Sequence, residues 1–219
     1  MNRLQFRPMR IIEVLGALTF LVVATITVLT IAPNAIRSAS GASPADWTSA
    51  ESGPIGPSDR DFLIKVRQAG LWEIPTGQQA QERAGSQRVK EVGLMLASDH
   101  VKLDEQVRAL AAKLRVRLPS TPNSDQQGWM AELSQLSGEE YDKVFADRLR
   151  AAHGKVFAAV ALVRAGTKND EIRAFAQVAV DVVMKHMTLL ESTGRVDYAA
   201  LPTPPPPPLS PPSSRGRRR

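Results

Sequence analysis

Hydrophobic residues between positions 58 and 196 recur at alternating spacings of three and four, which is the pattern of amphipathic helices. The pattern predicts four long helices and one short helical segment: Ser58 to about Arg83, the residues after Gly85-Ser86 to about Arg117, the short segment Trp129–Leu136, Ser137 to Gly166, and a last helix from near Thr167. The first and second helices, and the third and fourth, are joined by short turns, so each pair should form an antiparallel hairpin. The sequence therefore predicts an all-α, up-down-up-down four-helix bundle over residues 58–196.

Two helix starts carry capping signals. Ser58 is followed three residues later by Asp61, and Ser137 is followed three residues later by Glu140. This is the spacing of a capping box, in which side chain and backbone satisfy each other's hydrogen bonds. We therefore expect the first and third helices to begin at these serines.

Pro75 lies inside the first predicted helix, two residues after Glu73. A proline in a helix interior removes one backbone hydrogen bond and bends the helix. Two consequences are open: the bend opens a pocket beside Glu73, or it only lets a long helix follow its neighbours.

An uncharged hydrophobic segment, residues 14–32, lies near the N-terminus. Nineteen helical residues extend roughly 28 Å, close to the thickness of a bilayer's hydrocarbon core. We expect residues 11–32 to form a transmembrane anchor, because a cleaved signal peptide usually has a shorter apolar core. Cleavage at Ser38-Ala39-Ser40 is the alternative, and it would give a secreted protein.

Arginines on the two sides of this segment predict its orientation. Three arginines precede it within residues 1–10, whereas only Arg37 follows closely. The excess of positive charge on the cytoplasmic side of membrane helices places residues 1–10 in the cytoplasm and the rest of the chain outside.

The segments that flank the predicted bundle differ from it in composition. Residues 33–57 are rich in Pro, Gly, Ser and Ala, as in a linker. Residues 197–219 are rich in proline and end in SSRGRRR. We expect this tail to lack packed structure; alternatively, it is a stiff polyproline spacer that presents a basic tip to anionic lipid or cell-wall polymer.

Charge and cysteine content narrow the function classes. The 219 residues include no cysteine, which excludes disulfides, cysteine-ligated zinc and cysteine nucleophiles. The net charge of +6 lies at the two ends of the chain, because residues 38–214 carry 20 positive and 21 negative charges. Nucleic-acid binding is therefore disfavoured. Phosphate-binding, serine hydrolase, zinc protease and calcium-loop motifs are also absent from the sequence.

The three histidines of the chain each fall on the apolar face of a different predicted helix: His100, His153 and His186. Chance would place all three there with a probability of roughly 0.08. Glu73 occupies the equivalent position on the first helix. Counted from the turns, these four residues lie near the middle of the bundle, but their depths differ by about one to two helical turns. We therefore expect only some of them to touch.

Three interpretations of these four residues are open. Imidazoles with one carboxylate suit a single zinc, iron or copper ion. A buried polar network without metal would also satisfy Glu73. Alternatively, the side chains lie at the bundle edge and reach solvent. A ferritin-type dinuclear site is disfavoured, because the residues three before the histidines are Ala97, Arg150 and Val183 rather than carboxylates. Asp99, next to His100, is expected to be exposed, because adjacent helical residues do not share a face.

Several segments resemble one bacterial family. Leu96-Ala-Ser-Asp99-His100 looks like the family's Met-Val-x-Asp-His, and Leu136-Ser-Gly-Glu-Glu-Tyr141-Asp142 looks like its Leu-Ser-Gly-x-x-Phe-Asp, with His153 matching the histidine that follows. Residues 58–192 are thus similar to the ferritin-like bundles called domain of unknown function 4142. The resemblance implies a ferritin-like fold, a secreted or membrane-anchored location and no established activity, so it supplies no catalytic residue.

Taken together, the sequence favours a membrane-anchored, extracytoplasmic helical bundle that is a non-enzymatic structural or interaction module of the bacterial envelope. The main alternative is a metal-binding or redox-active bundle with a mononuclear site formed by Glu73, His100, His153 and His186. A third hypothesis is a sensor whose buried histidines become charged below about pH 6.5.

Overall fold

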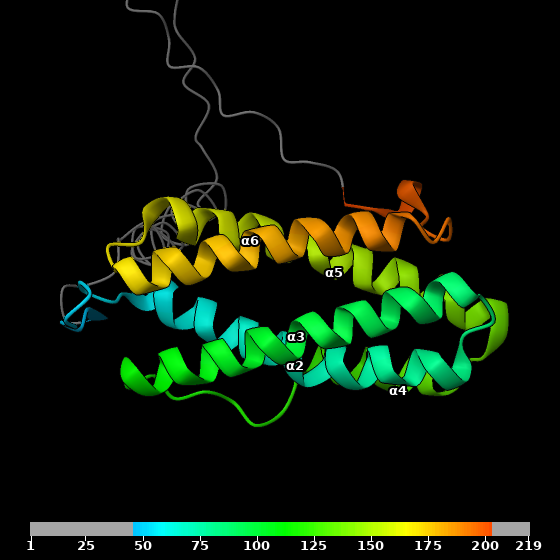
Figure 1. Cartoon of the computed structure of the whole chain (residues 1–219), viewed down its shortest axis with the longest axis horizontal. Helices are drawn as coiled ribbons and strands as arrows, with labels where there is room; N and C mark the ends of the chain where they lie inside the picture. The colour runs from blue at the N-terminus through cyan, green and yellow to red at the C-terminus, as the bar shows by residue number, and fades with distance from the viewer. Residues whose placement is uncertain (1–45, 203–219) are drawn as a thin grey trace, which may run out of the picture. The chain divides into compact units, whose positions relative to one another are not determined.

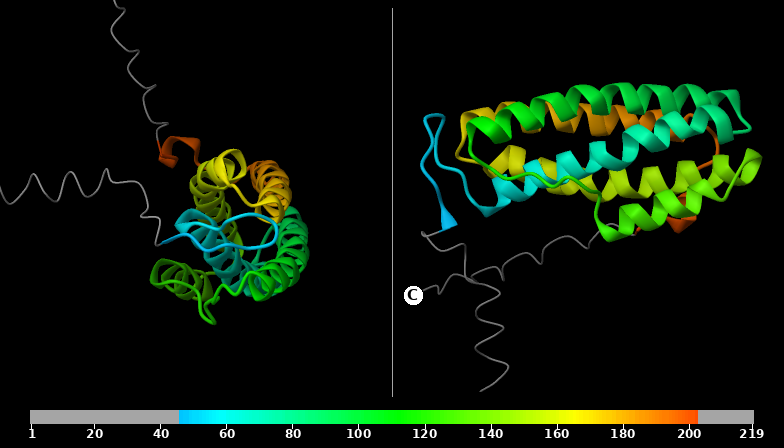
Figure 2. Two further views of the ribbon diagram at one scale, coloured as in Figure 1. Left: turned by 90° about the vertical axis from the view of Figure 1, so that its left-hand side faces the viewer. Right: turned by 90° about the horizontal axis from the view of Figure 1, so that it is seen from below.

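The computed structural model describes residues 46–202, which fold into helices (Figure 1). Within this range the chain forms five α-helices and no strand, which confirms the all-α class: α2 (Pro57–Arg83), α3 (Gln87–Lys113), α4 (Ser124–Ser134), α5 (Gly138–Gly166) and α6 (Asp170–Glu191). A short 3-10 helix, Tyr198–Ala200, follows. The four long helices lie side by side, as both views in Figure 2 show.

The long helices form two hairpins. Residues 84–86 connect α2 to α3, and residues 167–169 connect α5 to α6. Packing is most extensive within each hairpin and less extensive between α3 and α6 or between α2 and α5. The space between the hairpins is therefore filled mainly by side chains that reach across from both sides.

Two glycines bring the backbones of α2 and α3 into contact. A Cβ atom on Gly77 would lie 2.3 Å from the carbonyl oxygen of Gly93, and a Cβ atom on Gly93 would lie 2.8 Å from the Cβ atom of Ala80. Both distances are shorter than a van der Waals contact, so neither position accepts a larger residue without a shift of the helices. This contact fixes the separation of the two helices that carry Glu73 and His100.

The observed helix starts differ in detail from the predicted ones. Helix α2 is capped at Gly56, where the Asp59 carboxylate accepts a hydrogen bond from the Gly56 N–H at 2.8 Å, so the predicted cap at Ser58 is wrong by two residues. Ser137 does precede α5, but its side chain forms no capping hydrogen bond, so the predicted capping box is wrong there. Helix α2 also continues through Pro75 to Arg83.

Helices α3 and α4 also depart from their predicted limits. Helix α3 ends at Lys113 rather than near Arg117, because Arg115 adopts a left-handed conformation (φ 56°). Helix α4 begins at Ser124, five residues before the predicted segment. Asn123 and Gln126 explain the early start, since each side chain accepts a hydrogen bond from the other's backbone N–H at 3.0 Å.

The residues just before α2 pack against the helices. Thr48 and Ile55 pair through two backbone hydrogen bonds of 3.0 and 2.9 Å, and Ile55 is only 2% exposed. Asn169, at the start of α6, donates hydrogen bonds to the Ser52 hydroxyl and the Gly53 carbonyl. Residues 48–55, which composition assigned to the linker 33–57, are thus part of the folded unit that begins at Thr48.

The predicted basic segment 1–10, the anchor 11–32 and the end of the tail, 203–219, lie outside the described residues. Among the helices of residues 46–202, none is long and apolar enough to span a membrane.

The core of residues 46–202 contains two hydrophobic clusters. One includes Phe62, Leu63, Val66, Leu103, Val107, Val160, Ile172, Phe175 and Ala179. The other includes Trp72, Ala80, Val92, Leu96, Tyr141, Phe145, Leu149 and Leu190. On α3, α5 and α6 the histidine lies between the members of the two clusters, and on α2 Glu73 directly follows Trp72, the first member of the second cluster on that helix. A polar layer therefore separates two apolar ones.

The glycine contact gives a first testable prediction. Gly77→Ala should lower the free energy of unfolding by about 1–3 kcal/mol, because its methyl group meets the Gly93 carbonyl oxygen. Gly128→Ala in α4 is the matched control, because nothing lies within 4 Å of its Cβ position and alanine favours helix. The control should be neutral or stabilising in urea denaturation. Equal stability of Gly77→Ala and the wild type would contradict the close packing of α2 and α3.

Candidate metal centre

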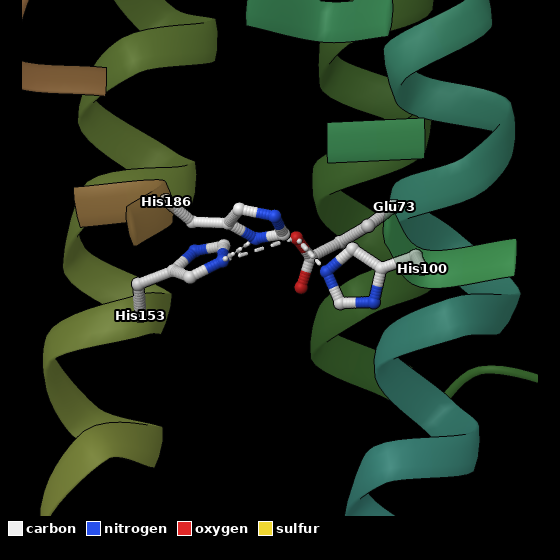
Figure 3. A group of neighbouring side chains, drawn as sticks. All are labelled: Glu73, His100, His153 and His186. Atoms are coloured by element: carbon white, nitrogen blue, oxygen red, sulfur yellow. Dashed lines mark hydrogen bonds and ion pairs between the residues drawn. The ribbon is translucent and has the colours of Figure 1, made fainter. Parts of the chain in front are cut away.

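The structure brings all four predicted site residues together. Glu73 comes from α2, His100 from α3, His153 from α5 and His186 from α6, and Figure 3 shows their side chains pointing toward one another. One potential ligand atom from each residue lies within 4.8 Å of those from the other three. All four residues are between 0 and 5% exposed, so the interpretation that they lie at the bundle edge is wrong.

The carboxylate of Glu73 lies closest to His100. Its Oε2 atom is 2.9 Å from His100 Nε2 and 3.5 Å from His153 Nε2. Despite these short distances, Glu73 Oε2 and both ring nitrogens of His100 form no properly directed hydrogen bond within residues 46–202. Glu73 Oε2 and His100 Nε2 thus lie close together, but they are not aligned as hydrogen-bond acceptor and donor. This is the arrangement expected of ligand atoms that face a common point.

The outer nitrogen of each of the other two histidines has a hydrogen-bond acceptor. His153 Nδ1 lies 2.8 Å from the Leu149 carbonyl oxygen, and His186 Nε2 lies 3.2 Å from Asp99 Oδ2. A carbonyl and an ionised carboxylate only accept, so each of these nitrogens carries the proton. In the neutral rings, the inner nitrogens, His153 Nε2 and His186 Nδ1, are then both unprotonated.

These two inner nitrogens lie 3.0 Å apart. With both rings neutral and both protons on the outer side, two lone pairs face each other and no hydrogen bond joins them. A cation between the nitrogens would convert this repulsion into attraction. The geometry alone thus indicates a binding position for a positively charged species.

The charges in the site also favour the binding of a cation. Burial alone would raise the pKa of Glu73, but His100, His153 and His186 together lower it to about 2. Burial lowers the pKa of His153, and burial together with the neighbouring histidines lowers the pKa of His186 to about 3. At neutral pH the site therefore holds a buried carboxylate beside the uncharged imidazoles of His153 and His186.

The separations suit a transition-metal ion. Zinc binds histidine nitrogen and carboxylate oxygen at about 2.0–2.2 Å, which places neighbouring ligands of a tetrahedral site about 3.4 Å apart. Three of the separations in the cluster are 2.9, 3.0 and 3.5 Å. All four potential ligand atoms lie within 4.8 Å of one another, so the most distant of them would have to move closer to share one ion. Iron and copper also bind imidazole, so the donor set alone does not select among the three metals.

Asp99 was missed by the sequence argument, which expected an exposed side chain. The Asp99 side chain is only 13% exposed, and its Oδ2 atom lies 2.6 Å from Lys185 Nζ as well as 3.2 Å from His186 Nε2. Helical spacing relates only neighbours on the same helix, whereas Asp99 contacts Lys185 and His186 of α6. The sequence feature that could have identified Asp99 as part of the site is its position directly before His100.

The fold and the four side chains define a class: a helical bundle with a buried three-histidine, one-glutamate cluster. Residues 45–192 match the family described as "Domain of unknown function (DUF4142)", and the chain belongs to this family, which confirms the resemblance noted in the sequence. No curated protein matches the chain.

One solved structure is similar in fold. It is the crystal structure of a DUF305 fragment from Deinococcus radiodurans, which superposes with a TM-score of 0.55 at 17% sequence identity. The match covers 64% of this chain and 97% of that fragment. At this identity the likeness concerns the fold alone.

The lowered pKa values predict a pH dependence of stability for the metal-free protein. Below about pH 6.5 the unfolded chain binds protons on its histidines, whereas folded His186 binds its proton only near pH 3. The free energy of unfolding should therefore be constant above pH 6.5. It should fall by up to about 1.4 kcal/mol per pH unit for each of His153 and His186 as the pH drops toward 4.5.

The measurement is urea denaturation at several pH values with chelator present. His186→Gln is the comparison, because glutamine does not titrate, so the variant should show a shallower dependence. Glu73 contributes only below about pH 4.5, since its pKa is lowered from 4.5 to about 2. A wild-type stability that is flat from pH 7 to 5 would contradict the assignment of neutral buried histidines.

Proposed function

We propose that this protein binds one transition-metal ion through Glu73, His100, His153 and His186. The observation that carries the proposal is the 3.0 Å approach of His153 Nε2 to His186 Nδ1, with the outer nitrogen of each ring facing a hydrogen-bond acceptor. The buried Glu73 carboxylate beside them supplies the negative charge that a cation requires.

A polar network without metal explains less of the geometry. Such a network has to provide hydrogen bonds for its buried groups, because an unpaired buried polar atom costs about 1–3 kcal/mol. Within residues 46–202, Glu73 Oε2 and both His100 nitrogens lack such bonds. A metal ion would bind Glu73 Oε2 and His100 Nε2 simultaneously and leave only the outer His100 nitrogen unpaired.

The closed ligand set favours a structural role over catalysis. Structural zinc sites use four protein ligands, whereas catalytic sites usually keep a position open for water or substrate. Here four buried side chains converge, two from each hairpin. The proposed ion therefore joins the α2–α3 hairpin to the α5–α6 hairpin, and the protein is a non-enzymatic module. Iron or copper at the same position would instead support the redox-active alternative.

We further infer the location from the sequence. The uncharged segment 14–32 and the arginines before it support a single-pass anchor, with the N-terminus cytoplasmic and an up-down-up-down, ferritin-like four-helix bundle outside, in the bacterial envelope. Cleavage of the anchor would release the same bundle as a secreted protein. The Arg-rich end of the tail supports contact with anionic lipid or cell-wall polymer, and the charge distribution does not support nucleic-acid binding.

The direct test is elemental analysis of the full chain, purified without chelator and with its affinity tag removed. We expect one equivalent of zinc, iron or copper. His153→Ala should lose it, because the variant removes one of four ligands. Tyr141→Phe on the same helix is the control: it removes a buried hydrogen bond to the Thr76 carbonyl, costs about 1 kcal/mol and should keep the metal.

Metal content below a tenth of an equivalent, without a rise in melting temperature when zinc, iron or copper is added, would refute the proposal. Equal loss of metal in His153→Ala and Tyr141→Phe would show that metal content reports general stability rather than ligation.

A further inference from the structure

Two pairs of adjacent residues contact each other between the two hairpins. Helix α3 carries Asp99-His100 and helix α6 carries Lys185-His186. Both histidines belong to the proposed metal centre, and their preceding residues, Asp99 and Lys185, form an ion pair of 2.6 Å. The Oδ2 atom of Asp99 also lies 3.2 Å from Nε2 of His186, the histidine of the other pair.

The contact of Asp99 with His186 determines which nitrogen of that ring faces the site. Asp99 Oδ2 accepts a hydrogen bond of 2.6 Å from the Lys185 ammonium group and lies 3.2 Å from His186 Nε2, so a carboxylate paired with a lysine faces the ring. An ionised carboxylate cannot donate, and His186 Nε2 must therefore carry the proton. The lone pair of the ring is left on Nδ1, toward His153.

Charge around Asp99 supports this arrangement. Lys185 lies 2.6 Å from Oδ2, and Lys102 lies 3.8 Å from Oδ1. Two cations outside the site hold the carboxylate in its ionised form, while the fully buried His186 ring contacts it from inside. An exposed ion pair alone contributes little to stability, so the significance of Asp99 lies in its contact with the ring.

We propose that Asp99 is a positioning residue of the metal centre, which holds His186 in the form that presents Nδ1 to the ion. The inference rests on the proposed metal-binding function. In metal sites, a carboxylate that accepts the outer N–H of a ligating histidine fixes the ring orientation, and its loss typically weakens metal affinity 10–100-fold. Asp99 lies on α3 and His186 on α6, so this contact joins residues of different hairpins.

The test compares zinc affinity of the full chain in three variants, measured by competition with a chelator of known affinity. Asp99→Ala should weaken binding about 10–100-fold. Asp99→Asn should fall between wild type and Asp99→Ala, because its amide oxygen still accepts from His186 but the charge is lost. The matched control is Asp104→Ala on the same helix: its carboxylate pairs with Arg67 and is 12% exposed, against 13% for Asp99. The control should keep wild-type affinity.

A second readout uses the metal-free full chain, in which ¹⁵N NMR of the histidine side chains reports which ring nitrogen carries the proton. Wild type and Asp104→Ala should show His186 protonated on Nε2. Asp99→Ala should shift the ring toward protonation on Nδ1 or toward a mixture. A merely stabilising role for Asp99 would not change this pattern, and Asp99→Leu, which also removes the acceptor, gives the same readout where the alanine variant folds poorly.

The outcomes separate the two proposals. Zinc binding by wild type together with unchanged affinity and unchanged protonation in Asp99→Ala would overturn the role of Asp99 and leave the metal centre intact. A wild type that binds none of zinc, iron and copper would refute the proposed function, and the NMR comparison would then decide by itself whether Asp99 orients His186. Weakened affinity in Asp104→Ala equal to that in Asp99→Ala would also overturn the inference.

Discussion

The burial of one carboxylate is the constraint on which the middle of this molecule depends. Glu73 is almost completely removed from water, and an ionised group in such a place requires positive charge or several hydrogen-bond donors. The neighbouring imidazoles lower the pKa of Glu73, but two of them face the site with unprotonated nitrogens and donate no hydrogen bond to the carboxylate. A bound cation satisfies the carboxylate and the imidazoles at once, which is why the geometry favours a metal centre over a network of hydrogen bonds.

The position of the cluster gives that cation a structural consequence. Hydrophobic side chains pack above and below the polar layer in two separate clusters, and the helices pack more extensively within each hairpin than between the hairpins. An ion bound by two residues from each hairpin adds a connection at the level where apolar packing is interrupted. The Asp99 contact to His186 and Lys185 crosses the same boundary farther out. The polar layer thus contributes to the assembly of the bundle as well as to any chemistry at the ion.

Much of the fold and most of the site could be predicted from the sequence. The periodicity of apolar positions gave the four long helices, and the placement of histidines on apolar faces identified His100, His153 and His186. Counting residues from the turns suggested that only some of these side chains would touch. Long side chains and the actual limits of the helices bring all four ligand atoms within 4.8 Å, which residue counting does not resolve. Asp99 escaped prediction because its partners lie on another helix, and the early start of α4 depends on a reciprocal contact between Asn123 and Gln126.

X-ray absorption spectroscopy at the edge of the metal that copurifies with the full chain tests whether that metal is bound by Glu73 and the three histidines. Ligation by this cluster predicts about four light donors, three imidazoles and one carboxylate, at about 2.0–2.2 Å. It also predicts that the imidazole scattering is reduced in a variant that lacks one of the three histidines. A sulfur neighbour, a shell made only of oxygen donors, or a spectrum that is the same in wild type and in the histidine variants would contradict the assignment of the metal to this cluster.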